Sequence, residues 1–330
     1  MAHHIKAKRM FGIVDLIALV FLISVPGKAG ALELESIKVA LTQKDLLITH
    51  MPFFVALEKG FYAKQGLKVE LVSFTGGGDT IRGITSKAVS FAGMASTDAA
   101  MIAFSQGVPI RFIAGQAYTT TALNWLVKKD APYKSIRDIR GKKIGFTRPG
   151  AVGEFYLQQI LKKEGISNDV TTVPVGDFAQ NWTAVETGQI DVAQANDPLQ
   201  AKLIKEGKAR ILFRAMDYIK DTANADAFAM VDYLEKNPET VRKYLRAMKE
   251  ANAYVYQYPD EAIAIYAKAT GTDLDIARIS FNNLVPDCMY LYPRMSGLNY
   301  VNNALVERGI IKKAIDLNKF VDTRFLPPEK

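Results

Sequence analysis

The distribution of apolar residues along the chain predicts two series of short buried strands separated by amphipathic helices. Apolar runs of about four to eight residues are typical of buried strands, whereas apolar positions recurring every three or four residues are typical of helices. Because strands alternate with helices, we expect an α/β fold with mostly parallel sheets. The first series of predicted strands covers residues 37–43, 67–74, 89–93 and 110–115, and the second covers residues 143–147, 171–175, 190–194 and 210–214.

The two series repeat one another at a spacing of about one hundred residues. Residues 85–113 have the same order of features as residues 186–213: a polar turn, a short strand, a loop of small residues, a helix, a glycine and another strand. The repeat predicts two α/β lobes. Three pairs of matching residues establish the spacing of the repeat: Gly66 with Gly165, Ser86 with Thr187, and Gly107 with Gly207.

The C-terminal third of the chain predicts helices without a sheet of their own. Residues 238–257 and 259–271 have helical apolar spacing, and each segment begins with a proline at a position typical of the first helical turn. Such helices need a sheet to pack on, which we expect the first lobe to supply. The predicted organisation is therefore a first lobe of residues 36–122 and 226–330, a second lobe of residues 127–221, and hinge crossings near residues 122–127 and 221–226, with a ligand cleft between the lobes.

The first thirty-one residues have the features of a cleavable secretory signal. Lys6, Lys8 and Arg9 form a basic start, residues 11–25 are an apolar run interrupted by Asp15, and Ala29-Gly30-Ala31 fits a signal peptidase site. We therefore expect residues 1–31 to be a signal peptide and the mature protein to lie in the periplasm. An uncleaved membrane anchor is the alternative.

Composition removes several classes of function. The chain has 330 residues and a single cysteine, Cys288, so no disulfide can form within it and no lipid-anchor cysteine stands at the cleavage site. The formal net charge of +8 falls to about +5 after cleavage, and the basic residues are scattered among acidic ones. Nucleic-acid binding is therefore not expected. His50 is the only histidine left after cleavage, so we expect no metal site and no other cofactor.

Three segments resemble periplasmic solute-binding proteins of the nitrate, sulfonate and taurine ABC importers. "HMPFFVALEKGFYAKQGLKVELV" (50–72) is similar to the opening signature of that family, "AVSFAGMASTDAAMIAFSQGVPIRFIAG" (88–115) to its next segment, and "SIRDIRGKKIGFTRPGAVGEFYLQQILKKEGI" (135–166) to a strand and helix that follow. The resemblance implies a two-lobed type II periplasmic-binding-protein fold, a ligand trapped between the lobes and delivery to a membrane permease. The family also includes binders of thiamine pyrimidine precursors and a fungal pyrimidine synthase.

In the second lobe, the turn after residues 143–147 offers a candidate grip for an anion. Arg148 would supply a fork of donors, Gly150 would let the backbone approach, and the N–H groups at Ala151 and Val152 would begin a helix. A solvated arginine on an ordinary turn is the alternative. The glycine spacing fits neither a P-loop nor a dinucleotide-binding turn.

Further candidates follow the other predicted strands, because ligands in such folds lie beyond the carboxyl ends of strands. Helix capping is the alternative role for the hydroxyl and carboxylate residues among them. Four aromatic residues near the loops and crossings are candidates to sandwich a ring or an alkyl group, although an aromatic residue in an α/β protein is usually part of the core. They are Phe53, Trp125, Trp182 and Phe228. The remaining candidates are Gln43, His50, Met51, Gly77, Gly78, Ser96, Thr97, Asn196 and Asp197.

These observations favour a binding protein over an enzyme. A serine-protease-like triad would need His50, but the chain has no G-x-S-x-G motif, and we expect no catalytic residue. The leading hypothesis is a monomeric extracytoplasmic receptor that captures a small organic anion, such as a sulfonate or carboxylate, and delivers it to an ABC importer. The alternatives are a thiamine-pyrimidine-precursor binder or a related synthase on the same fold, and a regulatory domain.

Overall fold

The computed structural model describes residues 34–329, apart from residues 43–46, 119 and 121–122. The chain divides into two compact units, Met1–Glu33 and Leu34–Lys330, and all features below belong to the second. The predicted signal peptide and candidate residue Gln43 lie outside the described residues. Among the described residues, no helix has both the length and the apolar character needed to cross a membrane.

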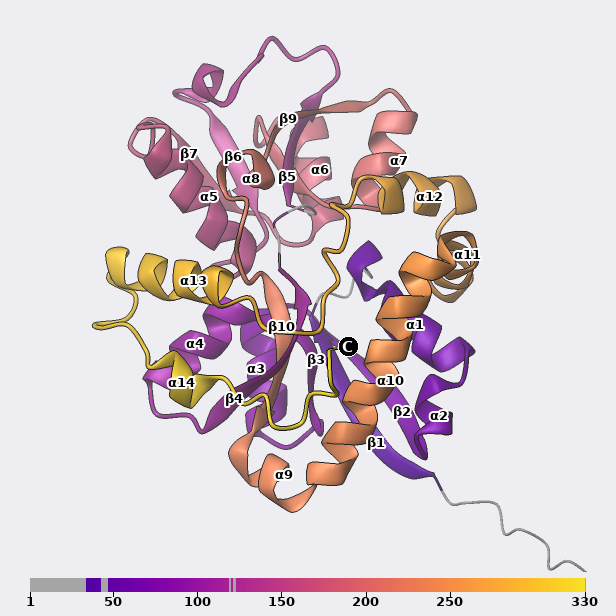
Figure 1. Cartoon of the computed structure of the whole chain (residues 1–330). Coiled ribbons are helices and arrows are strands. Elements are labelled where there is room, and N and C mark those ends of the chain that lie inside the picture. Colours follow the sequence, from indigo (N-terminus) through magenta and orange to yellow (C-terminus); the bar gives the residue numbers. More distant parts are fainter. Residues whose placement is uncertain (1–33, 43–46, 119, 121–122, 330) are drawn as a thin grey trace, which may run out of the picture. The chain divides into compact units, whose positions relative to one another are not determined.

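A five-stranded mixed sheet forms the core of the first lobe (Figure 1). In the order β2-β1-β3-β10-β4, β1 runs parallel to β2 and β3, whereas β10 runs antiparallel to β3 and β4. The late strand β10 is therefore inserted between two early ones. The bounds are Glu35–Thr42 for β1, Leu67–Phe74 for β2, Phe91–Ser96 for β3, Ile110–Ala117 for β4 and Ala225–Met230 for β10.

The second lobe has two small sheets joined by a bridge. Strand β5 lies between β8 and β9 and runs antiparallel to both, β6 runs parallel to β7, and Ile144 of β6 bridges Val192 beside β8. Residues 122–127, expected to be a crossing, include the first four residues of β5. The bounds are Asn124–Lys128 for β5, Lys143–Phe146 for β6, Thr171–Pro174 for β7, Ala193–Ala195 for β8 and Ala209–Arg214 for β9.

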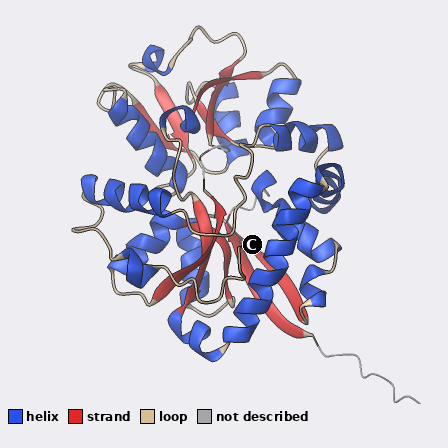
Figure 2. Cartoon of the chain, viewed as in Figure 1, coloured by secondary structure: helices blue, strands red, loops and turns tan. Residues whose placement is uncertain are grey.

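Helices flank these sheets (Figure 2). The helices of the first half are α1 Met51–Glu58, α2 Phe61–Lys64, α3 Gly77–Thr85, α4 Thr97–Ser105 and α5 Val152–Lys163, with 3-10 turns at Ile48–His50 and Ile136–Ile139. The helices that follow are α6 Phe178–Glu186, α7 Leu199–Lys205, α8 Ala215–Tyr218, α9 Val231–Lys236, α10 Pro238–Gln257, α11 Pro259–Thr270, α12 Leu274–Asn282, α13 Met295–Glu307 and α14 Leu317–Phe320.

The first sheet is buried on both faces, because successive side chains of a strand point to opposite sides. Val39 and Leu41 belong to the core under α1 and α10, while Ala40 between them belongs to the core under α3 and α4. Helices α10 and α11 begin at their prolines as predicted and pack against α1. The predicted C-terminal helices therefore pack against an element of the first lobe.

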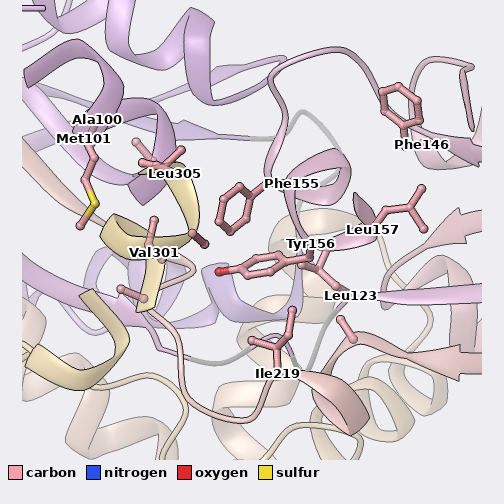
Figure 3. Close-up of a cluster of buried hydrophobic side chains, with 14 of the residues drawn as sticks. Ala100, Met101, Leu123, Phe146, Phe155, Tyr156, Leu157, Ile219, Val301 and Leu305 are labelled. Carbon is pink, nitrogen blue, oxygen red and sulfur yellow. The ribbon is translucent and has the colours of Figure 1, made fainter. Parts of the chain in front are cut away.

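A buried apolar cluster connects the lobes (Figure 3). Phe155 and Tyr156 on α5 of the second lobe lie in one continuous core with Met101 on α4 and Leu305 on α13. The Tyr156 hydroxyl is 2.6 Å from the hydroxyl of Thr222, just before β10. Helix α5 is thus anchored at its buried face, which positions its N-terminus beside the strand ends of both lobes.

The sequence repeat has a structural counterpart in the turns that end helices. Gly66 and Gly165 both adopt left-handed backbone, with φ of +76° and +67°. At the second anchor, Gly188 has φ +78°, and Lys87 adopts φ +61° at the matching place in the first lobe. The left-handed region is costly for a residue with a Cβ atom. The first lobe therefore keeps the conformation of the turn without its usual glycine.

Candidate functional site

A small enclosed cavity lies where strand ends of both lobes meet, and we call it the inner cavity. Thr42 and Ser96 are the last residues of β1 and β3, while Thr147 and Asn196 directly follow β6 and β8. The cavity has a volume of about 30 Å³. Its lining consists of Thr42, Leu47, Thr49, Met94, Ser96, Leu123, Thr147, Val152, Gly153, Phe178, Gln194, Asn196, Asn224 and Ala225.

The polar groups of the inner cavity are neutral. Hydroxyls and amides make up its polar lining, and none of the described lining residues carries a charged side chain. Thr49 Oγ1 and Asn196 Oδ1 are buried and have no hydrogen-bond partner among the described residues. Because buried polar groups are normally hydrogen-bonded, these two atoms point to a bound molecule or water as the missing partner. An amide oxygen only accepts, so the partner of Asn196 Oδ1 must be a donor.

Gly153 brings backbone and side chain close together on one wall of the inner cavity. A Cβ atom at this position would lie 2.6 Å from Cδ of Gln194, closer than side chains approach. The same Gln194 accepts a hydrogen bond from the Thr147 N–H at 3.2 Å. The absence of a side chain at residue 153 therefore lets Gln194 lie across the start of α5 and hold the turn after β6.

Three helices begin close to the inner cavity without a side-chain cap. The residues preceding α3, α4 and α5 are Gly76, Ser96 and Ala151, and none makes a side-chain hydrogen bond to its helix. The unpaired N–H groups of a helix N-terminus favour acceptors and negative charge. This feature gives the site donors that no side chain supplies.

Several of the predicted site residues meet here. Ser96, Val152 and Asn196 line the inner cavity together, although they come from the end of β3, the start of α5 and the turn after β8. Gly77 packs directly against Ser96, since a Cβ atom on Gly77 would lie 2.6 Å from that of Ser96. Gly78 is exposed, and the only contact near its missing Cβ is the side chain of Arg82 at 3.7 Å.

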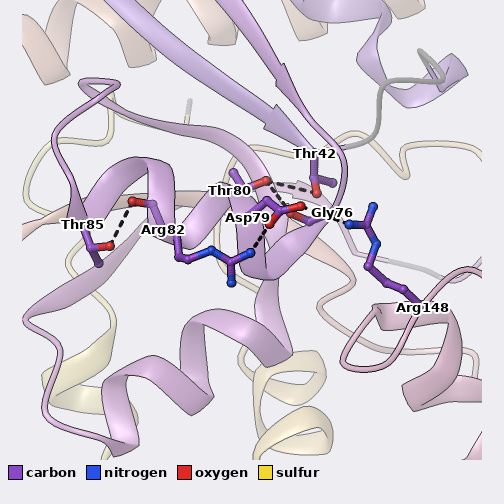
Figure 4. A network of polar contacts seen from close by, with 7 residues as sticks. All are labelled: Thr42, Gly76, Asp79, Thr80, Arg82, Thr85 and Arg148. Carbon is purple, nitrogen blue, oxygen red and sulfur yellow. Dashed lines mark hydrogen bonds and ion pairs between the residues drawn. The ribbon is translucent and has the colours of Figure 1, made fainter. Parts of the chain in front are cut away.

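Arg148 crosses to the other lobe instead of lining the inner cavity (Figure 4). Its Nη1 donates to Asp79 Oδ2 at 3.0 Å, and Asp79 also pairs with Arg82 on α3. The guanidinium lies against Gly76, where an added Cβ atom would be 3.1 Å away. Arg148 therefore joins the turn after β6 to the start of α3.

The other residues of the Arg148 turn use their N–H groups locally. The Gly150 N–H donates to the carboxylate of Glu154 at 2.7 Å, and Gly150 has φ +75°. The Ala151 N–H donates to the Arg148 carbonyl at 3.2 Å. In this structure neither N–H group is available to a ligand.

Thr97 supports the site from behind. Its hydroxyl donates to Asp226 Oδ2 at 2.6 Å, and the other carboxylate oxygen accepts from the Gln116 N–H at 3.3 Å. Burial raises the pKa of Asp226 to about 7. The contact fastens the loop after β3 to the strand β10 beside it.

Asp197 has a comparable supporting role in the second lobe. Its carboxylate accepts from the Ala201 N–H at 3.0 Å and from the Asn283 amide at 3.1 Å. Burial raises the pKa of Asp197 to about 6. Asn283 follows α12, so this contact joins the loop after β8 to the C-terminal helices.

His50 is fully buried beside the cavity residue Thr49 but does not line the inner cavity. Its Nδ1 accepts from the Leu47 N–H at 3.2 Å, and its Nε2 has no partner among the described residues. Burial lowers the pKa of His50 to about 4, so the ring is neutral near pH 7. Met51 is buried in the core under α1.

The aromatic candidates belong to the core of the protein. Trp125 is fully buried, stacks on Phe213 with ring centres 4.9 Å apart and donates to the Gly145 carbonyl at 3.2 Å. Phe228 is fully buried and packs edge-on against Phe112. Neither residue lines the inner cavity.

Sequence reasoning missed part of the lining. Thr49 and Thr147 are next to the candidates His50 and Arg148. Thr49 follows a predicted strand and Thr147 ends one, so the expectation that ligands lie beyond strand ends also applies to them. Gln194 lies within β8, where a strand pattern gives no reason to expect a site residue. The other missed residues are Thr42, Leu47, Met94, Leu123, Phe178, Asn224 and Ala225.

The architecture is the two-lobed α/β fold of the periplasmic binding proteins. The alkanesulfonate-binding protein SsuA of Xanthomonas axonopodis pv. citri, solved bound to MOPS, matches it with a TM-score of 0.74 over 88% of this chain and 99% of that chain, at 17% identity. The chain belongs to the NMT1/THI5-like family, whose model matches residues 48–262. The predicted family and the predicted two-lobed fold are thus confirmed. The expectation of mostly parallel sheets is wrong, because β10 and β5 each run antiparallel to both of their neighbours.

Two relatives show how the family varies. The riboflavin-binding protein RibY of Chloroflexus aurantiacus is 28% identical over 300 residues, covering 85% of this chain and 83% of RibY. The 4-amino-5-hydroxymethyl-2-methylpyrimidine phosphate synthase THI13 of Saccharomyces cerevisiae is 26% identical over 228 residues, covering 64% of this chain and 65% of the synthase. Both a binding protein and an enzyme are therefore among the relatives of this chain.

Proposed function

We propose that this protein is an extracytoplasmic substrate-binding protein that captures a small organic solute between its lobes and delivers it to an ABC importer. The observation that carries the proposal is the inner cavity, which combines strand ends of both lobes with two unpartnered buried polar atoms. A solute completes contacts from both lobes only when they close, so its differential affinity for the closed form drives closure. The permease would then recognise that form.

The proposed location follows from the N-terminal sequence. Residues 1–31 have the three parts of a secretory signal, which supports export and cleavage after Ala31. Detection of a mature N-terminus at Leu32 in an osmotic-shock fraction would support the proposal. A full-length chain in the cytoplasm would contradict it.

The cavity lining bears on the ligand class. An organic anion held by Arg148 would have to displace Asp79 from the guanidinium. The neutral hydroxyls and amides of the inner cavity favour an uncharged ring with N–H donors, such as a pyrimidine. We therefore propose a nitrogen heterocycle as the ligand class, and the organic anion is the competing one that the helix N-termini favour.

A thermal-shift screen tests the receptor and its ligand class together, because a ligand that binds only the native state raises the Tm. The probes are 4-amino-5-hydroxymethyl-2-methylpyrimidine, riboflavin, taurine, MOPS, benzoate and nitrate. We expect a heterocycle to raise the Tm and Asn196→Leu to abolish the shift. Arg148→Ala should preserve the shift of a heterocycle. A shift caused only by acids and lost in Arg148→Ala would instead establish the anion.

A synthase is the second candidate function, and His50 is the observation that favours it. The ring is neutral near pH 7, and it lies directly beside the cavity residue Thr49 and against the backbone of the cavity residue Thr42. A reaction would change the mass of a bound heterocycle or of the protein. Mass spectrometry after incubation should recover both unchanged if the protein is a receptor, and an altered mass that His50→Gln abolishes would establish the enzyme.

A further inference from the structure

A second cavity lies at the amino ends of β1 and β3, whereas the inner cavity lies at their carboxyl ends. We call it the basal cavity, and its volume is about 440 Å³. Ser36 and Lys38 of β1 line it together with Ser90, which directly precedes β3. The rest of its lining comes from the turn after α3, the end of β10 and the region of α9. None of the described lining residues is shared with the inner cavity.

The turn after α3 has a lysine where other helices of this protein have a glycine. Lys87 lies two residues beyond the end of α3, and its φ is +61°. A left-handed backbone is easily adopted by glycine and unfavourable for a residue with a Cβ atom. Seven other helices, α1, α2, α4, α5, α6, α7 and α13, have a glycine with positive φ at the same distance from their ends: Gly60, Gly66, Gly107, Gly165, Gly188, Gly207 and Gly309.

The turns at Lys87 and Gly188 are otherwise alike. In both, the left-handed residue donates its N–H to the carbonyl three residues earlier, at 3.0 Å for Lys87 and 3.2 Å for Gly188. The next N–H donates to the carbonyl five residues before it, at 3.1 Å and 2.8 Å. The geometry of the turn therefore gives no reason for a lysine. A residue kept in an unfavourable conformation is a reason to look for a function of its side chain.

The side chain of Lys87 lies at the mouth of the basal cavity. Its Nζ is 2.8 Å from Asp232 Oδ2 on α9, and the two side chains are 72% and 43% exposed. An ion pair as exposed as this one contributes little to stability, so it does not account for the unfavourable backbone. The ammonium group has two further hydrogen atoms to donate, and solvent exposure leaves them accessible to a ligand.

The mouth of the basal cavity is positively charged. Lys38 and Lys236 are exposed and line it with Lys87, so the lining carries three ammonium groups and one carboxylate, that of Asp232. Lys38 pairs with the exposed Glu70 at 3.4 Å. The Lys236 ammonium has no hydrogen-bond or ion-pair partner among the described residues. This arrangement favours an anionic group.

The inner part of the basal cavity is apolar. Ile84 and Val89 are buried, and Met230 and Tyr233 are half-buried. The Tyr233 ring packs edge-on against Phe91, with ring centres 5.9 Å apart, which fixes its position. The volume lies within the range of about 300–1,000 Å³ that is usual for organic ligands. Charge at the mouth and apolar surface beneath it suit a molecule that has one acid group and an apolar body.

We propose that the basal cavity is a second ligand site, which binds a small organic acid. The acid group is held by Lys87 and Lys236, and the apolar body lies on Ile84 and Val89. A neutral ligand would not use the lysines, and an inorganic anion would leave the apolar surface uncovered. The site is separate from the one between the lobes and does not depend on the proposed receptor function.

Matched acids and amides test the proposal by isothermal titration calorimetry with the mature protein. The pairs are indole-3-acetate with indole-3-acetamide, and hexanoate with hexanamide, so each pair shares its apolar body and differs in charge. We expect the acid of at least one pair to bind at least tenfold more tightly than its amide. Its affinity should fall as salt is added, because salt screens exposed charges. Equal affinities within both pairs, or no binding by either acid, would overturn the site.

Variants of residue 87 locate the bound acid. Lys87→Ala and Lys87→Gly both remove the ammonium group, and each should lower the affinity for the acid at least tenfold. Lys129→Ala is the matched control, because Lys129 is an exposed lysine of the second lobe that does not line the basal cavity. It should keep the affinity within about twofold. Undiminished affinity in both variants of residue 87 would overturn the site.

Asp232→Asn distinguishes ligand binding from a purely structural role of the ion pair. It breaks the same pair as Lys87→Ala but removes a negative charge from the lining. The affinity for the acid should therefore rise about threefold in Asp232→Asn, whereas it falls in Lys87→Ala. A loss of affinity in both variants would show that the pair only holds the turn, and it would overturn the site.

Thermal denaturation tests whether the backbone at residue 87 is strained. Lys87→Gly should have a Tm about 2 °C above that of Lys87→Ala, because only glycine adopts the left-handed backbone without cost. Equal Tm values would remove the reason to assign the lysine a function and would overturn the proposal. The receptor proposal would stand in either case, because its screen depends on neither Lys87 nor Asp232.

Discussion

The ends of β3 and β8 occupy matching places in the two lobes, and at each end one residue lines the inner cavity while the next makes a supporting contact. Ser96 and Asn196 each line the inner cavity, and the residue that follows each of them faces away from it to make a supporting contact. Thr97 donates to Asp226, and Asp197 accepts from Asn283. At both places, one polar residue lines the inner cavity, and the residue after it makes a hydrogen bond that keeps the segment in position.

The two supports differ in what they join. Thr97 begins α4 directly after β3, and Asp226 lies in β10, which pairs with β3. Asp197 is instead joined to a segment after α12, a helix that packs against both α11 and α7. The first support holds regardless of how the lobes lie, whereas the second can form only while the second lobe and the C-terminal helices are together. The two halves of the repeat thus keep a cavity-lining residue at the same place, but the residue after it contacts its own sheet in the first lobe and the C-terminal helices in the second.

The largest expected effect comes from removing the first support. Asp226→Ala would leave the Thr97 hydroxyl and the Gln116 N–H buried without an acceptor, which should cost about 3 kcal/mol of unfolding free energy. Urea denaturation measures this. Asp226→Asn keeps an acceptor and should lose less than half as much. Equal losses in both variants would show that the carboxylate contacts do not hold this loop.

Asp197→Ala should cost about 2 kcal/mol of unfolding free energy, because it deprives the Ala201 N–H and the Asn283 amide of their acceptor. Unlike Asp226→Ala, it should also favour the open arrangement. Small-angle scattering of the ligand-free protein would then give a larger radius of gyration for Asp197→Ala alone. An unchanged radius would contradict the coupling assigned to this loop.

The pH dependence of stability provides a further distinction. The pKa of Asp226 is raised to about 7 in the folded protein, compared with about 3.9 in an unfolded chain. The folded state therefore holds the proton more tightly, and this carboxyl adds stability as the pH falls from about 7 to about 4, by at most about 1.4 kcal/mol per pH unit. Comparison with Asp226→Asn isolates the effect: the difference in unfolding free energy should shift in favour of the unaltered protein as the pH falls.

His50 acts with the opposite sign, so the comparison must be made between variants. Its folded pKa of about 4 lies below the ordinary 6.5, and its stabilising contribution is lost as the pH falls through that interval. Because His50 is present in both proteins, its effect cancels in the difference. A difference that stays constant from pH 7 to pH 4 would show that Asp226 does not titrate in this range.

The smallest effects are expected on ligand affinity, from substitution of the cavity residues Asn196 and Ser96. Asn196→Ala should weaken binding of a heterocycle by about tenfold, because an N–H donor of the ligand loses its acceptor, at a cost of about 1.4 kcal/mol. Ser96→Ala should weaken it by only a few-fold, since a neutral hydroxyl contributes less. Calorimetry at constant pH measures both. Equal affinities in both variants and the unaltered protein would place the ligand elsewhere.

The sequence predicted the strands well because each is a short apolar run bounded by turn residues. Strand β5, Asn124–Lys128, was not predicted, because it continues directly from the chain that leaves the first lobe and no turn residues mark its start. Candidate site residues were predicted from their position after strands, whereas the contacts that their side chains make could not be predicted. Strand ends indicated Ser96 and Asn196, which both line the inner cavity, but periodicity cannot say that Arg148 meets Asp79, since 69 positions separate them. Likewise, nothing local reveals that Thr97 binds a strand formed much later in the chain.

Gly153 has no side chain, and adding one at this position would change the shape of the inner cavity. A single methyl group there would push the Gln194 amide aside and release the Thr147 N–H that it now accepts. Gly153→Ala would therefore reshape two walls of the inner cavity and leave the Thr147 N–H without its acceptor. The shape of the inner cavity therefore depends on a single missing atom.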